Sequence, residues 1–539
     1  KGAPGALLAL SIGGDELRMR RLIWAFALIL LMTACRTLAP VPSPAVTPAE
    51  TLSLPPEATA TASATPLPTL APTPLALRAL ADQAEALLGP FDGDVMVLDG
   101  ATVYTIEATV EFDGTASIAT IDGTARIRYT HKGPDLLDDI ALMLWPNNEQ
   151  YRGSMTVGPA LIEGELVAGQ RELGGLAVRY PLPQSLLDGE AVDLSVPFHV
   201  RAEGPIGGQT PHRFGISEGV LFAPTFYPIV PRRIDGSWEV RDAPPGGDTT
   251  NSLVSAYRVR LNVPADLDLV ATGVSIAREP VAAGRVEVDY VSGPVRDFAF
   301  ALGEMSTGSR SVDGVQVNVW VLPNHENEIG RVLRAAADQV MLLDELVGAY
   351  PYTELDVVDV PGAYGGIEYP GLVSIGTLGT EWVIEPVVHE VAHQWFYGLI
   401  GDDQLEEPWM DEAFAMYATA LYYENVVGGG RATGYLADYR DVVRNAPDPG
   451  RPIGLGVGEY VGSDYSTFVY LKGALFYQEL RQQLGDDIFF EFLKRFFDQY
   501  RYRVATAHDF QVTAESTCGC QLDSLFEEWV FEGGSSPFP

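Results

Sequence analysis

Between residues 100 and 303 the chain follows the alternation of apolar and polar positions that is typical of half-buried β-strands. β-branched residues are frequent in this region, and Gly, Pro, Asn and Asp separate the alternating runs. Helical periods are scarce. The pattern therefore predicts an all-β domain of bent antiparallel sheets. Its clearest predicted strands are residues 103–112, 117–129, 139–144, 257–263 and 285–291.

From about residue 317 onward the pattern becomes mixed. Strands are predicted at 317–322 and 354–360. A helix over 329–346 lies between them, and Gly348 and Pro351 close it. We therefore expect the second half to be a mixed α/β domain with a small sheet and a helical lobe. The last predicted helices of this lobe span 489–500 and 522–531.

Two consecutive helices are predicted in the middle of the second half. Pro386 suits the first turn of the earlier helix and Gly398 suits its end, whereas Pro408 opens the later helix. Apolar residues recur at helical spacing in both, which predicts one buried stripe on each. The stripe residues are Val388, Val391, Trp395 and Leu399 in the earlier helix and Phe414, Tyr417 and Leu421 in the later one.

The chain before the β region is predicted to begin with a targeting segment. Residues 1–18 are expected to be a spurious extension ahead of a start at Met19. Arg20 and Arg21 then precede an apolar stretch over 22–32 that is too short to span a bilayer. These features are typical of the basic and apolar parts of a signal peptide.

The predicted signal peptide ends in a cysteine. Residues 32–35, Met-Thr-Ala-Cys, resemble a bacterial lipoprotein cleavage box, and cleavage before Cys35 would leave that cysteine for lipid attachment. We therefore expect 19–35 to be a lipoprotein-type signal peptide. The protein would then be exported and lipid-anchored to the outer face of the bacterial cytoplasmic membrane, or otherwise extracytoplasmic. An ordinary signal peptide with an incidental cysteine is the alternative.

A tether is predicted between this segment and the folded part. Residues 36–76 are rich in Pro, Thr, Ala and Ser and poor in large apolar side chains, so we expect a disordered linker. Helical spacing over 75–88 predicts a short leading helix. The expected domains are then an N-terminal β domain over 77–303, which includes that helix, and a catalytic domain over 304–539.

The charge of the chain excludes one class of partner. There are 72 acidic residues against 35 basic ones, a net charge of −37, whereas nucleic-acid binding needs a basic surface. Acidity of this size keeps an exported protein soluble. A second interpretation is that a negative field attracts cationic substrates such as free peptide N-termini.

Cysteine usage gives no disulfide framework. The chain has three cysteines, and the two that remain beside Cys35 are Cys518 and Cys520. This Cys-Gly-Cys pair would form a small-ring disulfide or stay reduced. No further cysteines complete a metal-ligand set around it.

The chemistry of the second half centres on His389-Glu390-Val391-Ala392-His393. On a helix, histidines four residues apart lie on one face and can bind one zinc ion. Glu412, on the following predicted helix, would supply a third ligand, and Glu390 would take a proton from the attacking water. Three protein ligands and an open position are the arrangement of a catalytic zinc site. We therefore predict a hydrolase with one Zn²⁺ per chain. The alternative is an exposed helix with coincidental residues.

Several segments in this order resemble the gluzincin zinc aminopeptidases, the family of aminopeptidase N and leukotriene hydrolase. Beside the zinc motif and its spacing to Glu412, residues 365–370 (Gly-Gly-Ile-Glu-Tyr-Pro) resemble the family's Gly-x-Met-Glu-Asn segment. Residues 409–415 (Trp-Met-Asp-Glu-Ala-Phe-Ala) resemble Trp-Leu-Asn-Glu-Gly-Phe-Ala, and residues 470–473 (Tyr-Leu-Lys-Gly) resemble Tyr-x-Lys-Gly. The resemblance covers roughly 100–539 and includes 123–129 and 296–303 in the β region.

The resemblance implies an α+β multidomain fold. An N-terminal all-β domain of bent antiparallel sheets would precede a thermolysin-like mixed α/β catalytic domain. The family's large C-terminal helical domain is expected to be missing, as in a short bacterial-type member, which would leave a more open cleft.

The resemblance also implies roles for residues at matching positions. Glu390 would be the general base. Glu368 would lie on an edge-strand segment of the cleft and pair with the free α-ammonium of a peptide. Gly365 and Gly366 would let the backbone approach the substrate in strand-like pairing.

Tyr470 matches the family tyrosine that hydrogen-bonds the oxyanion, and Tyr465 is its rival. His508 is a weaker alternative, because thermolysin-type endopeptidases use a downstream histidine there. The family's second amine-binding group is not securely assigned, and Glu218 is a weak candidate. Glu424 is predicted to be a solvated surface residue.

Three positions depart from the family pattern. Tyr369 replaces an asparagine, and Asp411 and Ala413 replace Asn and Gly beside the third ligand, which puts specificity in doubt more than zinc binding. The predicted function is removal of N-terminal amino acids from peptides. A zinc endopeptidase or another open-cleft zinc hydrolase is one alternative, and a non-catalytic gluzincin-like binding scaffold is another. The sequence does not indicate the preferred side chain or the oligomeric state.

Overall fold

The structure of the protein is a computed structural model that describes residues 81–204, 213–244, 246–248, 251–362, 365–376, 378–380 and 383–534. The predicted extension, signal peptide, lipidated Cys35 and linker lie outside the described residues. Of the predicted leading helix, the described part includes the short 3₁₀ helix η1, Ala84–Ala86, and a second 3₁₀ helix, η2 (Gly89–Leu98), follows it.

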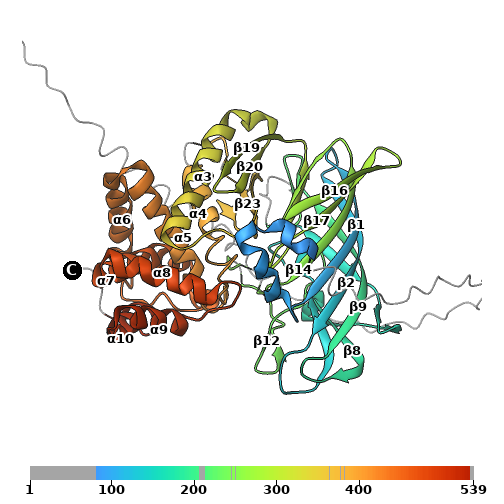
Figure 1. Ribbon diagram of the computed structural model, residues 1–539, viewed down its shortest axis with the longest axis horizontal. Coiled ribbons are helices and arrows are strands. Elements are labelled where there is room, and N and C mark those ends of the chain that lie inside the picture. The colour runs from blue at the N-terminus through green and yellow to red at the C-terminus, as the bar shows by residue number, and fades with distance from the viewer. Residues whose placement is uncertain are drawn as a thin grey trace, which may run out of the picture.

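The N-terminal half is built on a large sheet, on the right of Figure 1. Its strand order is β16-β17-β14-β1-β2-β9-β5-β6, and β4 also pairs with β9. The bounds are β1 Val103–Asp113, β2 Ile118–Thr130, β4 Gly153–Val157, β5 Ala160–Ile162, β6 Glu165–Val167, β9 Ala191–Glu203, β14 Ala256–Pro264, β16 Val274–Val281 and β17 Arg285–Val291.

Smaller antiparallel sheets complete this half. One has the order β10-β11-β18-β15, another has the order β3-β8-β7, and β12 pairs with β13. Their bounds are β3 Leu137–Met143, β7 Gln170–Glu172, β8 Ala177–Leu186, β10 Gly215–Ser217, β11 Val220–Phe222, β12 Arg233–Ile234, β13 Ser237–Trp238, β15 Asp268–Ala271 and β18 Phe300–Gly303, with 3₁₀ turns η3 Trp145–Asn147 and η4 Leu173–Gly175.

The alternating pattern explains these strands. In β9 every second side chain from Val192 to Ala202 is buried, so one face of the strand covers the core. The five predicted strands of this half are confirmed as β1, β2, β3, β14 and β17. One pairing differs from the expected antiparallel arrangement, because β1 and β14 run parallel. These two strands are far apart in the sequence, so no hairpin fixes their relative direction.

The second half begins with a mixed sheet of order β19-β20-β21-β23-β22. β20, β21 and β23 are parallel, and β22 is an antiparallel edge strand. The helix α3 (Ile329–Leu346) connects β20 to β21 and has the predicted bounds. The strands are β19 Ser306–Val312, β20 Val315–Val321, β21 Glu354–Asp359, β22 Gly366–Ile367 and β23 Leu372–Ile375.

A helical lobe follows the mixed sheet, on the left of Figure 1. The central helix of this lobe, α5, is buried along its whole length, so the side chains of α5 have little contact with bulk water. The expected α+β fold, antiparallel sheets followed by a mixed domain, is confirmed. The helices are α4 Ile384–Ala392, α5 Trp409–Tyr422, α6 Gly429–Arg444, α7 Gly473–Leu484, α8 Asp486–Tyr500, α9 Ala507–Cys518 and α10 Asp523–Phe526, with 3₁₀ helices η5 Pro323–Glu328 and η7 Val457–Glu459 and π-helical segments η6 Tyr423–Gly428, η8 Ser466–Lys472 and η9 Glu527–Phe531.

The predicted end of the helix around 386–399 is wrong. α4 ends at Ala392, and the chain then continues in wider turns. The amides of Gly398 and Leu399 donate to carbonyls five residues earlier, at 2.9 and 3.1 Å, and Tyr397 has a φ of 102°. Trp395 and Leu399 remain buried, so the apolar stripe survives although its last part is not α-helical. Apolar spacing alone does not distinguish the two windings.

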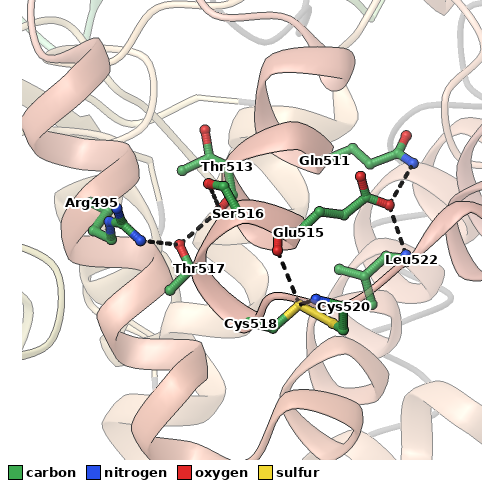
Figure 2. Close-up of a disulfide and its surroundings, with 9 residues drawn as sticks. All are labelled: Arg495, Gln511, Thr513, Glu515, Ser516, Thr517, Cys518, Cys520 and Leu522. Carbon is green, nitrogen blue, oxygen red and sulfur yellow. Dashed lines mark hydrogen bonds between the residues drawn. A yellow bond between two sulfur atoms is a disulfide. The ribbon is translucent and has the colours of Figure 1, made fainter.

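Cys518 and Cys520 form a disulfide at the C-terminal end of α9 (Figure 2). Gly519 between them ends the helix in the left-handed conformation, with a φ of 64°. The Glu515 carboxylate accepts hydrogen bonds from the Leu522 amide, at 2.7 Å, and from Gln511. Of the two states that the sequence left open, the structure has the disulfide.

Among the described residues, no helix combines the length and apolar character that crossing a membrane requires.

Candidate active site

Helix α4, the residue directly after it (His393) and helix α5 bring together the three predicted metal ligands. Nε2 of His389 lies 3.1 Å from Oε2 of Glu412 and 3.2 Å from Nε2 of His393. Nε2 of His393 lies 3.4 Å from the same Glu412 oxygen. His393 and Glu412 are buried, whereas His389 stays partly exposed, so the cluster is open on one side.

These distances fit a zinc ion. Ligand atoms about 2.0–2.1 Å from a tetrahedral metal are about 3.3 Å from one another, which the three observed separations match. Two imidazole nitrogens that face each other at this distance also repel through their lone pairs unless a proton or a cation lies between them. Imidazole and carboxylate donors are those that zinc prefers. The donor set therefore suits a divalent zinc ion held by three protein ligands.

The surroundings fix the orientation of one of the two rings. Nδ1 of His393 lies 3.2 Å from the carbonyl oxygen of Phe396 in the wide turn after α4. A proton on Nδ1 directed at that carbonyl leaves Nε2 with a lone pair toward the cluster. Because α4 ends early, the chain turns so that the Phe396 carbonyl lies within hydrogen-bond distance of the His393 ring.

The electrostatics of the cluster also favour a cation. Burial lowers the pKa of His389, which keeps this imidazole neutral. Burial acts the same way on His393, but hydrogen bonding to Glu412 and its charge raise the pKa of His393 well above the usual value. Burial alone would raise the pKa of Glu412, yet the two imidazoles lower it, so this carboxylate stays ionised.

Glu390 lies against Gly366 of the edge strand β22. A Cβ atom on Gly366 would lie 2.4 Å from Cγ of Glu390, which is closer than van der Waals contact allows. A Cβ on Gly365 would lie 3.8 Å from its nearest neighbour in Pro386, an ordinary contact. Of the two predicted glycines, Gly366 is therefore the one whose missing side chain makes room for Glu390.

Glu368 follows the edge strand directly and points into the same cluster. It is 6% exposed, and ligand atoms of Glu368, Glu390 and His393 all lie within 4.8 Å of one another. Burial, and next the nearby Asp248, raise the pKa of Glu368 to about 8. Burial also raises the pKa of Glu390 well above its usual value. The main cause of both raised pKa values is burial, and neighbouring acidic groups raise them further.

Gln394 attaches the strand segment to the metal-binding helix, and the sequence interpretation had missed it. Its Oε1 accepts a hydrogen bond from the Gly371 amide at 2.7 Å. Its Nε2 donates to the carbonyl oxygens of Glu368 and Tyr369, at 3.4 and 3.2 Å. Because Gln394 is adjacent to His393, these bonds fix the distance between Glu368 and the metal ligands.

Tyr470 reaches the cluster from the π-helical segment η8. Its hydroxyl donates to Oε1 of Glu412, and its ring stacks on His389 at a centroid distance of 6.1 Å. Burial raises the pKa of Tyr470 well above 10, so the phenol keeps its proton as a donor. The rival Tyr465 packs edge-on against Tyr470 at 5.6 Å, and its buried hydroxyl has no partner among the described residues.

Three weaker candidates lie elsewhere. His508 is exposed at the start of α9, and Glu218 is exposed in the turn between β10 and β11. Glu424 lies in η6 and pairs with Arg481 at the surface. Glu218 therefore does not take the place of the second amine-binding group.

The β domain contributes two charged residues to the surroundings of Glu368, which the sequence had not indicated. Arg213 and Asp248 form a buried ion pair, and Asp248 is the largest charged influence on the pKa of Glu368. These two residues lie in loops between strands, where no motif or periodicity singles them out.

Residues 340–529 match the family model of the peptidase family M1 domain. The chain carries a peptidase family M1 domain. Aminopeptidase M1 of Arabidopsis thaliana is 23% identical over 302 residues, which are 52% of this chain and 34% of the relative. Aminopeptidase B of Mus musculus is 26% identical over 235 residues, 41% of this chain and 36% of the relative. The chain therefore spans about a third of the length of these curated relatives. The resemblance to the gluzincin aminopeptidases is thus confirmed for the region that matches the M1 domain, residues 340–529.

Solved structures of similar architecture support the fold. The M1 zinc metallopeptidase from Deinococcus radiodurans is 20% identical, with a TM-score of 0.62 over 81% of this chain and 96% of that chain. A mutant of that enzyme bound to a Tyr-Ser-Ala substrate gives a TM-score of 0.61, also at 20% identity. At this identity the likeness shows a shared fold.

Proposed function

We propose that this protein is a zinc-dependent aminopeptidase that removes N-terminal residues from peptides. The observation that carries the proposal is the convergence of His389, His393 and Glu412 with an open side next to Glu390. The M1 domain match and the peptide bound to the Deinococcus radiodurans relative support a peptide substrate. One Zn²⁺ per chain would be held by the three ligands.

The residues around the metal would then divide the work of hydrolysis. Zinc, when bound, supplies a Lewis acid that polarises the scissile carbonyl and acidifies the attacking water. Glu390 takes the proton from that water and passes it to the leaving amine. Tyr470, a neutral phenol, donates a hydrogen bond where negative charge develops on the carbonyl oxygen.

Selection of the N-terminus would depend on Glu368. A free α-ammonium supplies the positive charge that this buried carboxylate lacks, and a charge-assisted hydrogen bond in a desolvated site is strong. An internal peptide segment has no such charge to offer. This argument favours an aminopeptidase over the endopeptidase and the other open-cleft hydrolase. A non-catalytic scaffold is disfavoured because every ligand and the base are present.

Removal of the metal tests this proposal. We expect a chelator to abolish hydrolysis of fluorogenic amino-acid amides, and zinc added back to restore it. Elemental analysis should give about one zinc per chain. The melting temperature should fall on chelation, because an ion that binds only the folded state stabilises it. Full activity in a metal-free preparation would contradict the proposal.

We further propose that the chain is exported and anchored to a membrane by lipid on Cys35. The support is the sequence pattern of Arg20 and Arg21, the apolar stretch 22–32 and the Met-Thr-Ala-Cys box. The full chain expressed in bacteria should fractionate with membranes, and Cys35→Ala should release it. Wild-type protein in the soluble fraction would contradict this anchor, and equal fractionation of both variants would exclude Cys35 as the attachment point.

A further inference from the structure

Gln404, in the loop between α4 and α5, holds two of the buried carboxylates near the zinc site. Its side chain is 3% exposed. Its Nε2 donates to Oε1 of Glu368 at 3.2 Å and to Oδ2 of Asp411 at 3.0 Å. Both hydrogens of this amide group are thus used, each on one carboxylate.

Asp411 connects this contact to a metal ligand. Its other oxygen, Oδ1, accepts a hydrogen bond of 2.7 Å from the backbone amide of Glu412. A continuous series of contacts therefore runs from Glu368, through Gln404 and Asp411, to the first turn of α5, which carries Glu412. The amide of Gln404 thus lies between two buried acidic side chains and donates a hydrogen bond to each of them.

The β domain holds the loop that carries Gln404. Asp403 accepts hydrogen bonds from the amides of Leu405 and Glu406, both at 3.1 Å, which shapes the loop. Arg232 and Arg241, on either side of the β12–β13 hairpin, each contact an Asp403 oxygen at 2.7 Å. The position of Gln404 is thus fixed by ion pairs across the interface between the two halves of the chain.

We propose that Gln404 is a positioning residue that sets the selectivity for free N-termini. It fixes the Glu368 carboxylate in the rotamer that meets a substrate ammonium, at a defined distance from the zinc ligands. A side chain held by packing and hydrogen bonds loses no further freedom when substrate binds, so the ammonium is bound more tightly. This inference rests on the proposed aminopeptidase function and assigns to Gln404 a role through Glu368, not a contact with the reacting atoms.

The test compares Gln404→Met with wild-type full-length protein. Met has a similar volume but cannot donate to either carboxylate. We expect KM for a free-amine dipeptide substrate to rise at least about tenfold, with a smaller change in kcat. The ratio of kcat/KM for the free-amine substrate to that for its N-acetylated form should fall by a similar factor. Melting temperature reports on folding, and zinc content reports on the metal site.

Two further variants make the result decisive. Glu406→Gln changes an exposed residue of the same loop that pairs with Arg241, and it should keep the wild-type ratio. Gln404→Asn retains an amide but is one methylene shorter, so its ratio of free-amine to acetylated kcat/KM should fall by a smaller factor. This variant tests the role of Gln404 if the Met variant does not fold.

The outcomes separate the two proposals. A wild-type protein that hydrolyses neither substrate would overturn the aminopeptidase function itself. An active wild type whose free-amine to acetylated ratio is unchanged in both Gln404 variants would overturn only the role of Gln404. A purely structural role for Gln404 would lower melting temperature or zinc content without changing the ratio, and that result would also overturn it.

Discussion

Glu390→Gln is expected to retain its zinc and to lose at least about two orders of magnitude in kcat. The substituted amide fills the same volume beside Gly366 and is not one of the three ligands. It cannot accept a proton at any pH compatible with folding, so the attacking water keeps its proton and the leaving amine receives none. KM should change little, because substrate binding does not depend on this base.

The measurement is steady-state hydrolysis of a free-amine dipeptide amide, with zinc content determined on the same preparation. Gly366→Ala tests the same carboxylate independently. The new Cβ would lie 2.4 Å from Cγ of Glu390, so the Glu390 side chain would have to move. Gly365→Ala is the matched control, since its nearest neighbour lies at 3.8 Å. Near-normal turnover by Glu390→Gln would remove this residue from the mechanism. Equal effects of the two alanine variants would show that the strand, not the position of Glu390, limits activity.

Local pattern was sufficient to predict most of the elements. The strand β17 and the helix α3 have the bounds that periodicity and the flanking glycine and proline residues indicated. The parallel pairing of β1 with β14 was not predictable, because the direction of a strand far away in the sequence leaves no local signal. The early end of α4 was missed for a related reason, since Trp395 and Leu399 are buried in either winding.

The residues of the candidate site were likewise predictable only in part. His389, Glu390 and His393 are close in sequence, so one helical turn predicts their arrangement, and Glu412 follows at a short distance. Gln404 and the pair of Arg213 and Asp248 have no such signal. Gln404 donates a hydrogen bond to Glu368, and Asp248 and Arg213 act on the pKa of Glu368 through their charges. A glutamine, an arginine or an aspartate in a loop gives no sign of such a role until the fold places it near a buried carboxylate. Sequence therefore predicted the metal chemistry, and the fold was needed to find what surrounds Glu368.

A peptide whose N-terminus is acetylated is expected to be nearly inert, with kcat/KM at least about a hundredfold below that of its free-amine form. Acetylation removes the ammonium and leaves Glu368 buried beside Glu390 without a counter-charge. Removing one partner of a buried ion pair costs about 3–5 kcal/mol, and about 1.4 kcal/mol corresponds to a factor of ten. The bulk of the acetyl group adds a steric cost that acts in the same direction.

Glu368→Gln separates the charge from the bulk. This variant should lose most of its activity on the free-amine peptide while its low rate on the acetylated peptide stays the same, so the two substrates converge. Both should be compared with Glu218→Gln, a matched change of an exposed glutamate in the β10–β11 turn that should keep the wild-type preference. Rapid cleavage of the acetylated peptide by the wild type would instead favour the endopeptidase alternative. In that case the metal site and Glu390 would keep their roles, and the buried Glu368 would need another positive partner from the substrate, such as a basic side chain.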